Sequence, residues 1–164
     1  MEGVNSEESL RSLIEEQIKA RKDYEIENKY VDMLLEEAAK NTEVEIPNEM
    51  VEEEIDRMMH EYEHNLQMQG LNLESFYKFT NSDELALREQ MRNDASIRVK
   101  YRFMLEEIIS LENIKVTDKE VEEEATKLAT QYNVSKDEFL SHVGGAEALR
   151  YDMSMQKAIE VLKA

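Results

Sequence analysis

One short pattern in this sequence could hold a catalytic metal: His60-Glu61-Tyr62-Glu63-His64. On a helix, two histidines one turn apart can bind zinc, and the glutamate between them can act as a general base. A catalytic zinc needs a third protein ligand, and the only other histidine, His142, is distant in sequence. The surrounding glutamates indicate a charged, solvated helix face, so we expect weak adventitious metal binding at most and no metal site.

No other set of residues in the sequence predicts catalysis. There is no Gly-x-Ser-x-Gly nucleophile motif or glycine-rich phosphate loop, and no cysteine to act as a nucleophile or a zinc ligand. With 38 acidic residues, neighbouring carboxylates arise by chance and predict no acid–base pair. We therefore expect no catalytic residues, no cofactor and no enzymatic activity.

Methionine is the residue type that most suggests a binding function. The chain has ten methionines, against four phenylalanines and no tryptophan. Methionine side chains are unbranched and polarizable, so a surface rich in them adapts to apolar ligands of many shapes. The residues predicted to bind such a ligand are Met58, Met59, Tyr62, Phe76, Tyr77, Phe79, Met104, Met153 and Met155.

Structural roles for these residues remain open alternatives. Helical spacing of methionines is also typical of residues that fill gaps between packed helices. The aromatic cluster at 76–79 could form the wall of a binding surface, or equally a hydrophobic plug that closes a helical hairpin.

The net charge restricts the partners that the protein can bind. At −18, the chain repels phosphate backbones and anionic lipid head groups, so we expect neither nucleic acid nor membrane as a partner. The sequence has no apolar span or signal-like segment, which favours a cytoplasmic location. Met1-Glu2-Gly3 reads as an added start from which an upstream part was removed, and residues 1–5 are expected to be such a start or a flexible end.

Apolar periodicity and capping residues predict an all-α fold. A long helix is expected from Ser6, its N-cap, to about Asn41; a second starts with Pro47 in its first turn and ends at Gly70. Residues 73–79 form a short aromatic segment, and Asn81 or Ser82 caps a third long helix that extends through Ile109. Later helices are predicted from two capping boxes, a glycine pair and a C-terminal apolar run: Thr117/Glu120, Ser135/Glu138, Gly144-Gly145 and a last helix to about Lys163. No segment alternates as a strand does, so we expect no β-sheet.

An internal repeat indicates how these helices are arranged. Leu35 to Ala39 matches Leu105 to Ile109, 70 residues later, and Val51 to Ile55 matches Val121 to Ala125 at the same displacement. The repeated unit is a long helix, a short link and a second helix. Each unit must bury an apolar face against a neighbour, which favours an elongated fold of helical-hairpin arms on a shared base over a compact four-helix bundle.

Several runs resemble the C-terminal domain of the trigger factor family, a family of ribosome-associated chaperones. These runs are VEIPNEMVEEEIDRMM, LQMQGLN, LLEEAAKNTEVEIP, LEEIISLENIKVTDKEVEEE and QKAIEVLKA. The resemblance implies one domain over 1–164, with a base helix at 6–41, a first arm at 47–111 and a second arm at 117–163. The family's ribosome-binding motif, G-F-R-x-G-x-x-P, has no match here, and no strand-rich stretch could form its prolyl isomerase domain. The ribosome is therefore expected as a partner only through domains absent from this sequence.

The resemblance and the methionine content together predict an ATP-independent chaperone of the holdase type. It would cradle unfolded or nascent polypeptides along the inner faces of its arms, with basic clients favoured by its acidic charge. The alternative is an acidic helical scaffold or adaptor that binds one defined partner helix. Whether the chain forms a homodimer stays open at this level.

Overall fold

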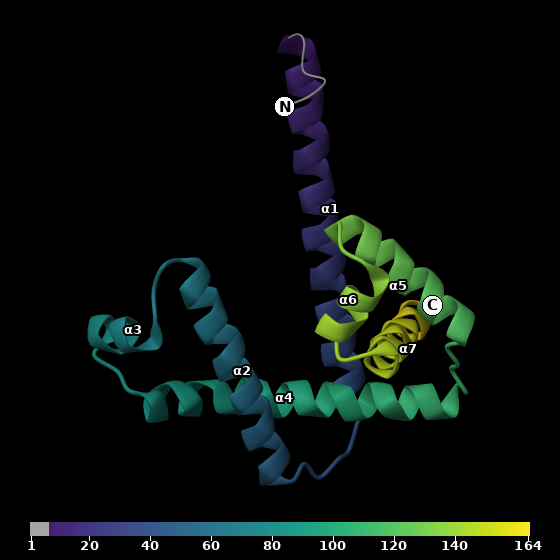
Figure 1. The fold of residues 1–164 in the computed structure, drawn as a ribbon. Coiled ribbons are helices and arrows are strands. Elements are labelled where there is room, and N and C mark those ends of the chain that lie inside the picture. Colours follow the sequence, from purple (N-terminus) through teal and green to yellow (C-terminus); the bar gives the residue numbers. More distant parts are fainter. Residues whose placement is uncertain (1–6) are drawn as a thin grey trace.

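The computed structural model describes residues 7–164, and side-chain burial from Leu10 onward. Within this range the chain forms seven helices and no strand, which confirms the all-α prediction (Figure 1). The helices are α1 (Glu7–Lys40), α2 (Asn48–Met68), α3 (Leu73–Thr80), α4 (Glu84–Leu111), α5 (Asp118–Tyr132), α6 (Lys136–His142) and α7 (Ala146–Lys163). The predicted N-cap Ser6 and the predicted start at 1–5 lie outside the described residues.

Two of the predicted helix starts are displaced, and both displacements have a local cause. Pro47 is the N-cap of α2, one residue before the helix, because its extended backbone (ψ 139°) is not helical. The prediction that Asn81 or Ser82 caps the third long helix is wrong. Asn81 adopts the left-handed conformation (φ 51°) that closes α3, and Asp83 caps α4 by accepting a 2.8 Å hydrogen bond from the Ala86 N–H.

The other predicted helix ends are present. Gly70 follows Gln69, the C-cap of α2, and has a φ of +74°, a conformation that glycine adopts without strain. Thr117 and Glu120 form a complete capping box at α5, whereas Ser135 accepts only the hydrogen bond from the Glu138 N–H at α6.

The described helices bury their apolar residues in three separate clusters. The first holds α2 to α4 together, with α3 lying across the end where α2 stops and α4 begins (Figure 1). The second is the base, where the ends of α1 and α4 meet α7, and the third joins α5, α6 and α7. The N-terminal half of α1 projects beyond all of them, so the molecule is elongated.

The 70-residue repeat corresponds to equivalent positions in the fold. Ile55 in α2 and Ala125 in α5 are both fully buried, and Val51 and Val121 are both core residues one turn earlier. The two units share this pattern but not its surroundings, because α2 packs on α4 whereas α5 packs on α6 and α7. The repeat therefore predicts which face is buried, although not which helix covers it.

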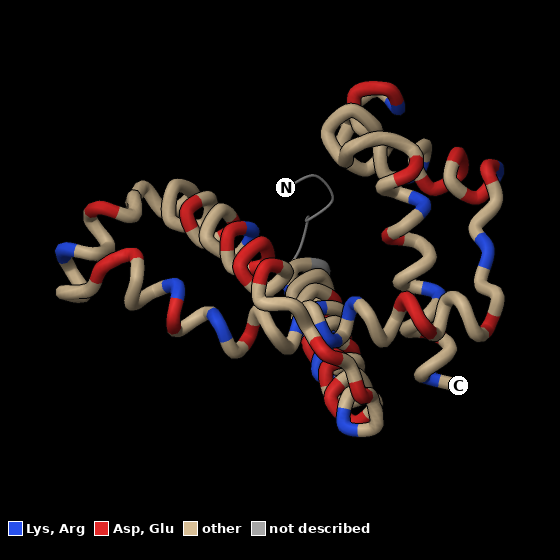
Figure 2. Tube along the Cα trace, turned by 90° about the horizontal axis from the view of Figure 1, so that it is seen from below, with Lys and Arg blue, Asp and Glu red and all other residues tan. Residues whose placement is uncertain are grey.

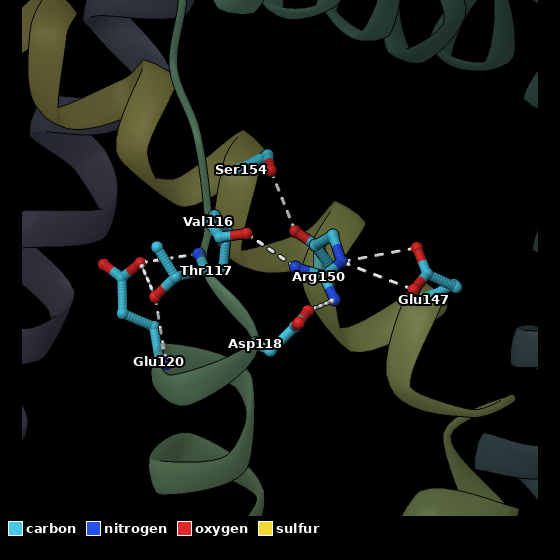
Figure 3. Close-up of polar contacts among 7 residues, drawn as sticks. All are labelled: Val116, Thr117, Asp118, Glu120, Glu147, Arg150 and Ser154. Carbon is cyan, nitrogen blue, oxygen red and sulfur yellow. Dashed lines mark hydrogen bonds and ion pairs between the residues drawn. The ribbon is translucent and has the colours of Figure 1, made fainter.

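Arg150 connects α7 with the link after α4 and with the start of α5 (Figure 3). Its guanidinium donates a 2.6 Å hydrogen bond to the Val116 carbonyl and lies 2.6 Å from an Asp118 carboxylate oxygen. Nearby, the Lys157 ammonium lies 2.6 Å from Glu120 and also donates to the Lys115 carbonyl. These bonds hold the start of α5 against α7.

The Glu120 contacts predict a pH-dependent contribution to stability. The Lys157 ammonium first, then the backbone and side chain of Thr117, lower the pKa of Glu120 from 4.5 to about 2. A carboxyl whose pKa is lower in the folded than in the unfolded state stabilises the fold above its unfolded pKa, and this contribution is lost as pH falls through the folded pKa.

We therefore expect Glu120→Gln to lower the thermal midpoint near neutral pH, and the difference from the parent to close as pH falls from 4.5 to 2. Circular dichroism melts across this range measure it. A difference that stays constant down to pH 2 would contradict the assignment.

Candidate functional site

Three of the predicted binding residues lie in the hydrophobic core. Met58 and Met59 belong to the cluster between α2 and α4, and Met104 belongs to the base cluster. Their exposed fractions are 9%, 8% and 5%. In this conformation they stabilise the helix packing and present little surface to a ligand, as the gap-filling alternative describes.

Three aromatic residues lie at the end of the hairpin that α2 and α4 form, which we call the first hairpin. The rings of Tyr62 and Phe76 meet edge to face at 5.2 Å between centroids, and those of Phe76 and Tyr77 at 6.0 Å. All three are half-buried and pack against the first cluster. Burial raises the pKa of Tyr77, and the carboxylates of Glu84 and Asp83 add to the shift. These aromatics therefore cover one end of the first core cluster, and each leaves part of its side chain exposed to solvent.

Phe79 is the predicted binding residue that the structure leaves fully open, with 96% of its surface exposed. The same end of the hairpin carries further exposed apolar side chains at the end of α2, in the link after it and in the first turn of α4. We call this group the tip surface: Met68, Leu71, Phe79 and Leu85. An exposed apolar group of this kind on a helical end is typical of a binding site.

Met68, Leu71 and Leu85 were not among the binding residues predicted from the sequence. Leu71 lies in a link, and Leu85 is off the apolar stripe that α4 buries, so periodicity alone assigns them no role. The signal that could have identified them is an apolar residue on the polar side of a helix end, next to a predicted aromatic turn.

Met153 and Met155 lie on different sides of α7. Met153 lines a groove of about 730 Å³ between α1, α5 and α7, together with Val31 and Ile159. Charged residues of both signs surround these apolar side chains, and a Glu27–Lys163 ion pair connects α1 with α7 along the groove. Met155 instead lines a shallow hollow of about 300 Å³ with Tyr101 and Leu105, between α4 and α7.

The predicted site is therefore divided between separate places in the fold. The tip surface and the closing aromatics lie at one end, and the groove lies on the other side of the base. Acidic residues recur along all of the helices that carry them, with basic residues interspersed (Figure 2). A ligand that contacts both places must be long and must tolerate an acidic surrounding.

His60 and His64 are both exposed on α2. Among the described residues, no three or more histidine, aspartate and glutamate side chains are grouped as a metal site would require. None of the described helices has the length and apolarity needed to cross a membrane.

Replacing both His60 and His64 with alanine is expected to leave helicity and polypeptide binding unchanged, because surface substitutions away from packed features have small effects. Circular dichroism and a zinc titration of the parent and the double variant measure this. Tight, stoichiometric zinc in the parent that disappears in the variant would contradict it.

Known proteins resemble this chain over nearly its whole length. Residues 7–164 match the family described as bacterial trigger factor protein (TF) C-terminus. Among curated proteins, trigger factor of Bacillus pumilus is 43% identical over 161 residues and that of Anoxybacillus flavithermus is 42% identical. Each alignment covers 98% of this chain but only 38% of the relative, so the chain spans less than half the length of these proteins.

A solved structure from work on the domains of trigger factor from Thermotoga maritima has a similar fold. Its TM-score is 0.61 at 25% sequence identity, and the superposition covers 84% of this chain and 81% of that chain.

Proposed function

Because the chain belongs to the trigger factor family, matching its C-terminal domain, we propose that it is a polypeptide-holding chaperone domain that works without ATP. The observation that carries this proposal is the tip surface, where a phenylalanine and three other large apolar residues stand open to solvent. Unfolded and nascent polypeptides expose the apolar segments that such a surface can cover.

The proposed binding is weak at each place and relies on several places together. Covering one large apolar side chain contributes about 1.5 to 3 kcal/mol when burial is complete, and association costs offset much of the sum. A few partly covered contacts then give affinities of about a micromolar, which suits reversible release. The predicted residues that remain accessible for this role are Tyr62, Phe76, Tyr77, Phe79, Met153 and Met155.

We propose that residues 6–41 form a long base helix, 47–111 a first arm with the tip surface at its end, and 117–163 a second arm that borders the groove. A client chain would extend from the tip surface towards the groove. In this scheme the chain is not an enzyme and touches the ribosome only through domains outside it. We propose that the domain acts in the cytoplasm, where nascent chains emerge.

The acidic charge adds selectivity to apolar contact. A net charge of −18 attracts basic unfolded chains and repels acidic ones, and salt screens both effects.

Aggregation assays with several unrelated denatured proteins test the proposal. We expect this chain to suppress aggregation of all of them without nucleotide, and basic clients most strongly at low salt. Protection of a single client only would favour the scaffold alternative, and no protection of any client would overturn the chaperone assignment.

A further inference from the structure

Helix α3 is held on the first cluster by apolar contacts and by its two links. Leu73, Phe76 and Tyr77 pack against this cluster, yet no residue of α3 is buried. The side-chain hydrogen bonds and ion pairs of α3, such as the exposed Glu74–Lys78 pair, stay within the helix and its N-cap. Among the described residues none of them connects α3 with α2 or α4, whereas several ion pairs join α2 to α4. Displacement of α3 therefore breaks no polar side-chain contact with its neighbours.

The links at the two ends of α3 are residues 69–72 and 81–83. Each contains a residue in the left-handed conformation, Gly70 at a φ of +74° and Asn81 at a φ of 51°. A helix of 8 residues is not stable by itself in water, because its first turn is costly to form and few hydrogen bonds follow. Once its apolar contacts are lost, α3 is free to unwind as well as to swing away.

One polar group opposes the packed position of α3. The Tyr77 hydroxyl is buried and has no hydrogen-bond partner among the described residues. A hydroxyl in this state has lost its contact with water without gaining a replacement, which costs free energy. Displacement of α3 returns the hydroxyl to water and removes this cost. The packed position is thus favoured by apolar contacts and opposed by Tyr77, as expected of a segment that opens locally.

We propose that α3 is a displaceable cover, and that the end of the first cluster under it is a second binding site for large apolar client side chains. This inference rests on the proposed function. The cluster members nearest to this end are Met59 of α2 and Leu87 of α4, which are only 8% and 6% exposed while α3 is packed (Figure 1). The occupant takes the place of Leu73 and Phe76, so the site already fits an aliphatic or aromatic group, and methionine adapts to either.

The covered site adjoins the tip surface, so a client held there can reach it. The client side chain then replaces the apolar contacts that α3 gives up. The measured affinity falls in proportion to the fraction of molecules in which α3 is displaced. A change that favours the packed position should therefore weaken client binding, and one that loosens α3 should strengthen it. If α3 served only as a rigid support for Phe79, loosening it would weaken binding instead.

Two substitutions shift α3 in opposite directions without altering the tip surface or the net charge. Tyr77→Phe keeps the ring and removes the unpaired hydroxyl, so it should slow amide exchange in α3 and raise the client dissociation constant by about threefold or more. Asn72→Ala removes the N-cap, which accepts a 2.8 Å hydrogen bond from the Ser75 N–H. It should speed exchange in α3 and lower the dissociation constant by about threefold. The probe is a fluorescently labelled, uncharged glycine–serine polypeptide that carries several phenylalanines.

Ser135→Ala is the matched control, because it removes the N-cap of another short helix, α6. It should speed exchange in α6 and leave the dissociation constant unchanged. If the parent binds the probe but the two α3 variants do not move its affinity in opposite directions, this proposal alone is overturned. The same holds if exchange in α3 is not slower in Tyr77→Phe, or if the control shifts the affinity as Asn72→Ala does. A parent that holds no client overturns the proposed function, and this inference with it.

Discussion

Replacing Met68, Phe79 and Leu85 together with serine is expected to weaken the binding of unfolded polypeptides by about tenfold or more, while the fold stays intact. These side chains are 76%, 96% and 77% exposed, so their removal takes almost nothing from the core. A client that covers them loses most of its apolar contact at the tip surface and keeps Leu71, the closing aromatics and the groove. Fluorescence titration with an unfolded client measures the change.

The matched control is Leu111→Ser combined with Met33→Ser. These residues are 72% and 57% exposed and lie outside the tip surface, so the change also removes exposed apolar side chains. The control is expected to bind clients as the parent does. Circular dichroism and thermal melting must show that both variants are folded, because instability would also reduce binding.

The same titrations separate apolar contact from charge. One basic and one acidic unfolded client are compared at low and high salt, with the parent and the tip variant. The basic client should bind more tightly at low salt in both proteins, because the substitutions leave the charge unchanged. If the folded tip variant held both clients as tightly as the parent, with no difference between salts, the proposed binding mechanism would be wrong.

Ile55→Ala is expected to have the largest effect on stability, about 2 to 5 kcal/mol in the free energy of unfolding of the first hairpin. Ile55 is fully buried between α2 and α4, and alanine leaves a cavity that the rigid helices cannot collapse to fill. The base and the third cluster share no core residue with this hairpin. The loss should therefore be local.

Amide hydrogen exchange distinguishes local from global loss. Exchange should speed up in α2, α3 and the first half of α4, and should change little in α5 to α7. Equal acceleration along the whole chain would show that the clusters unfold as one unit.

Much of this fold follows from local residue patterns. Helix ends depend on side chains within a few positions, so the capping box at Thr117 and the left-handed Gly70 are both readable from the sequence. Apolar spacing likewise identifies the buried face of each long helix, and the 70-residue repeat identifies matching core positions. The family resemblance is also readable from the sequence, because it rests on contiguous runs of residues.

The binding surface depended on tertiary packing instead. Met58 and Phe79 are both apolar residues on predicted helical segments, yet one is buried under α4 and the other is open to solvent. Periodicity places a residue on a face of a helix, but the exposure of that face depends on where the neighbouring helices stop. Leu10 and Ile14 of α1 are the same case. They continue the apolar stripe that Leu35 and Ala39 bury in the base, and they are 39% and 45% exposed because the base cluster includes only the C-terminal end of the helix.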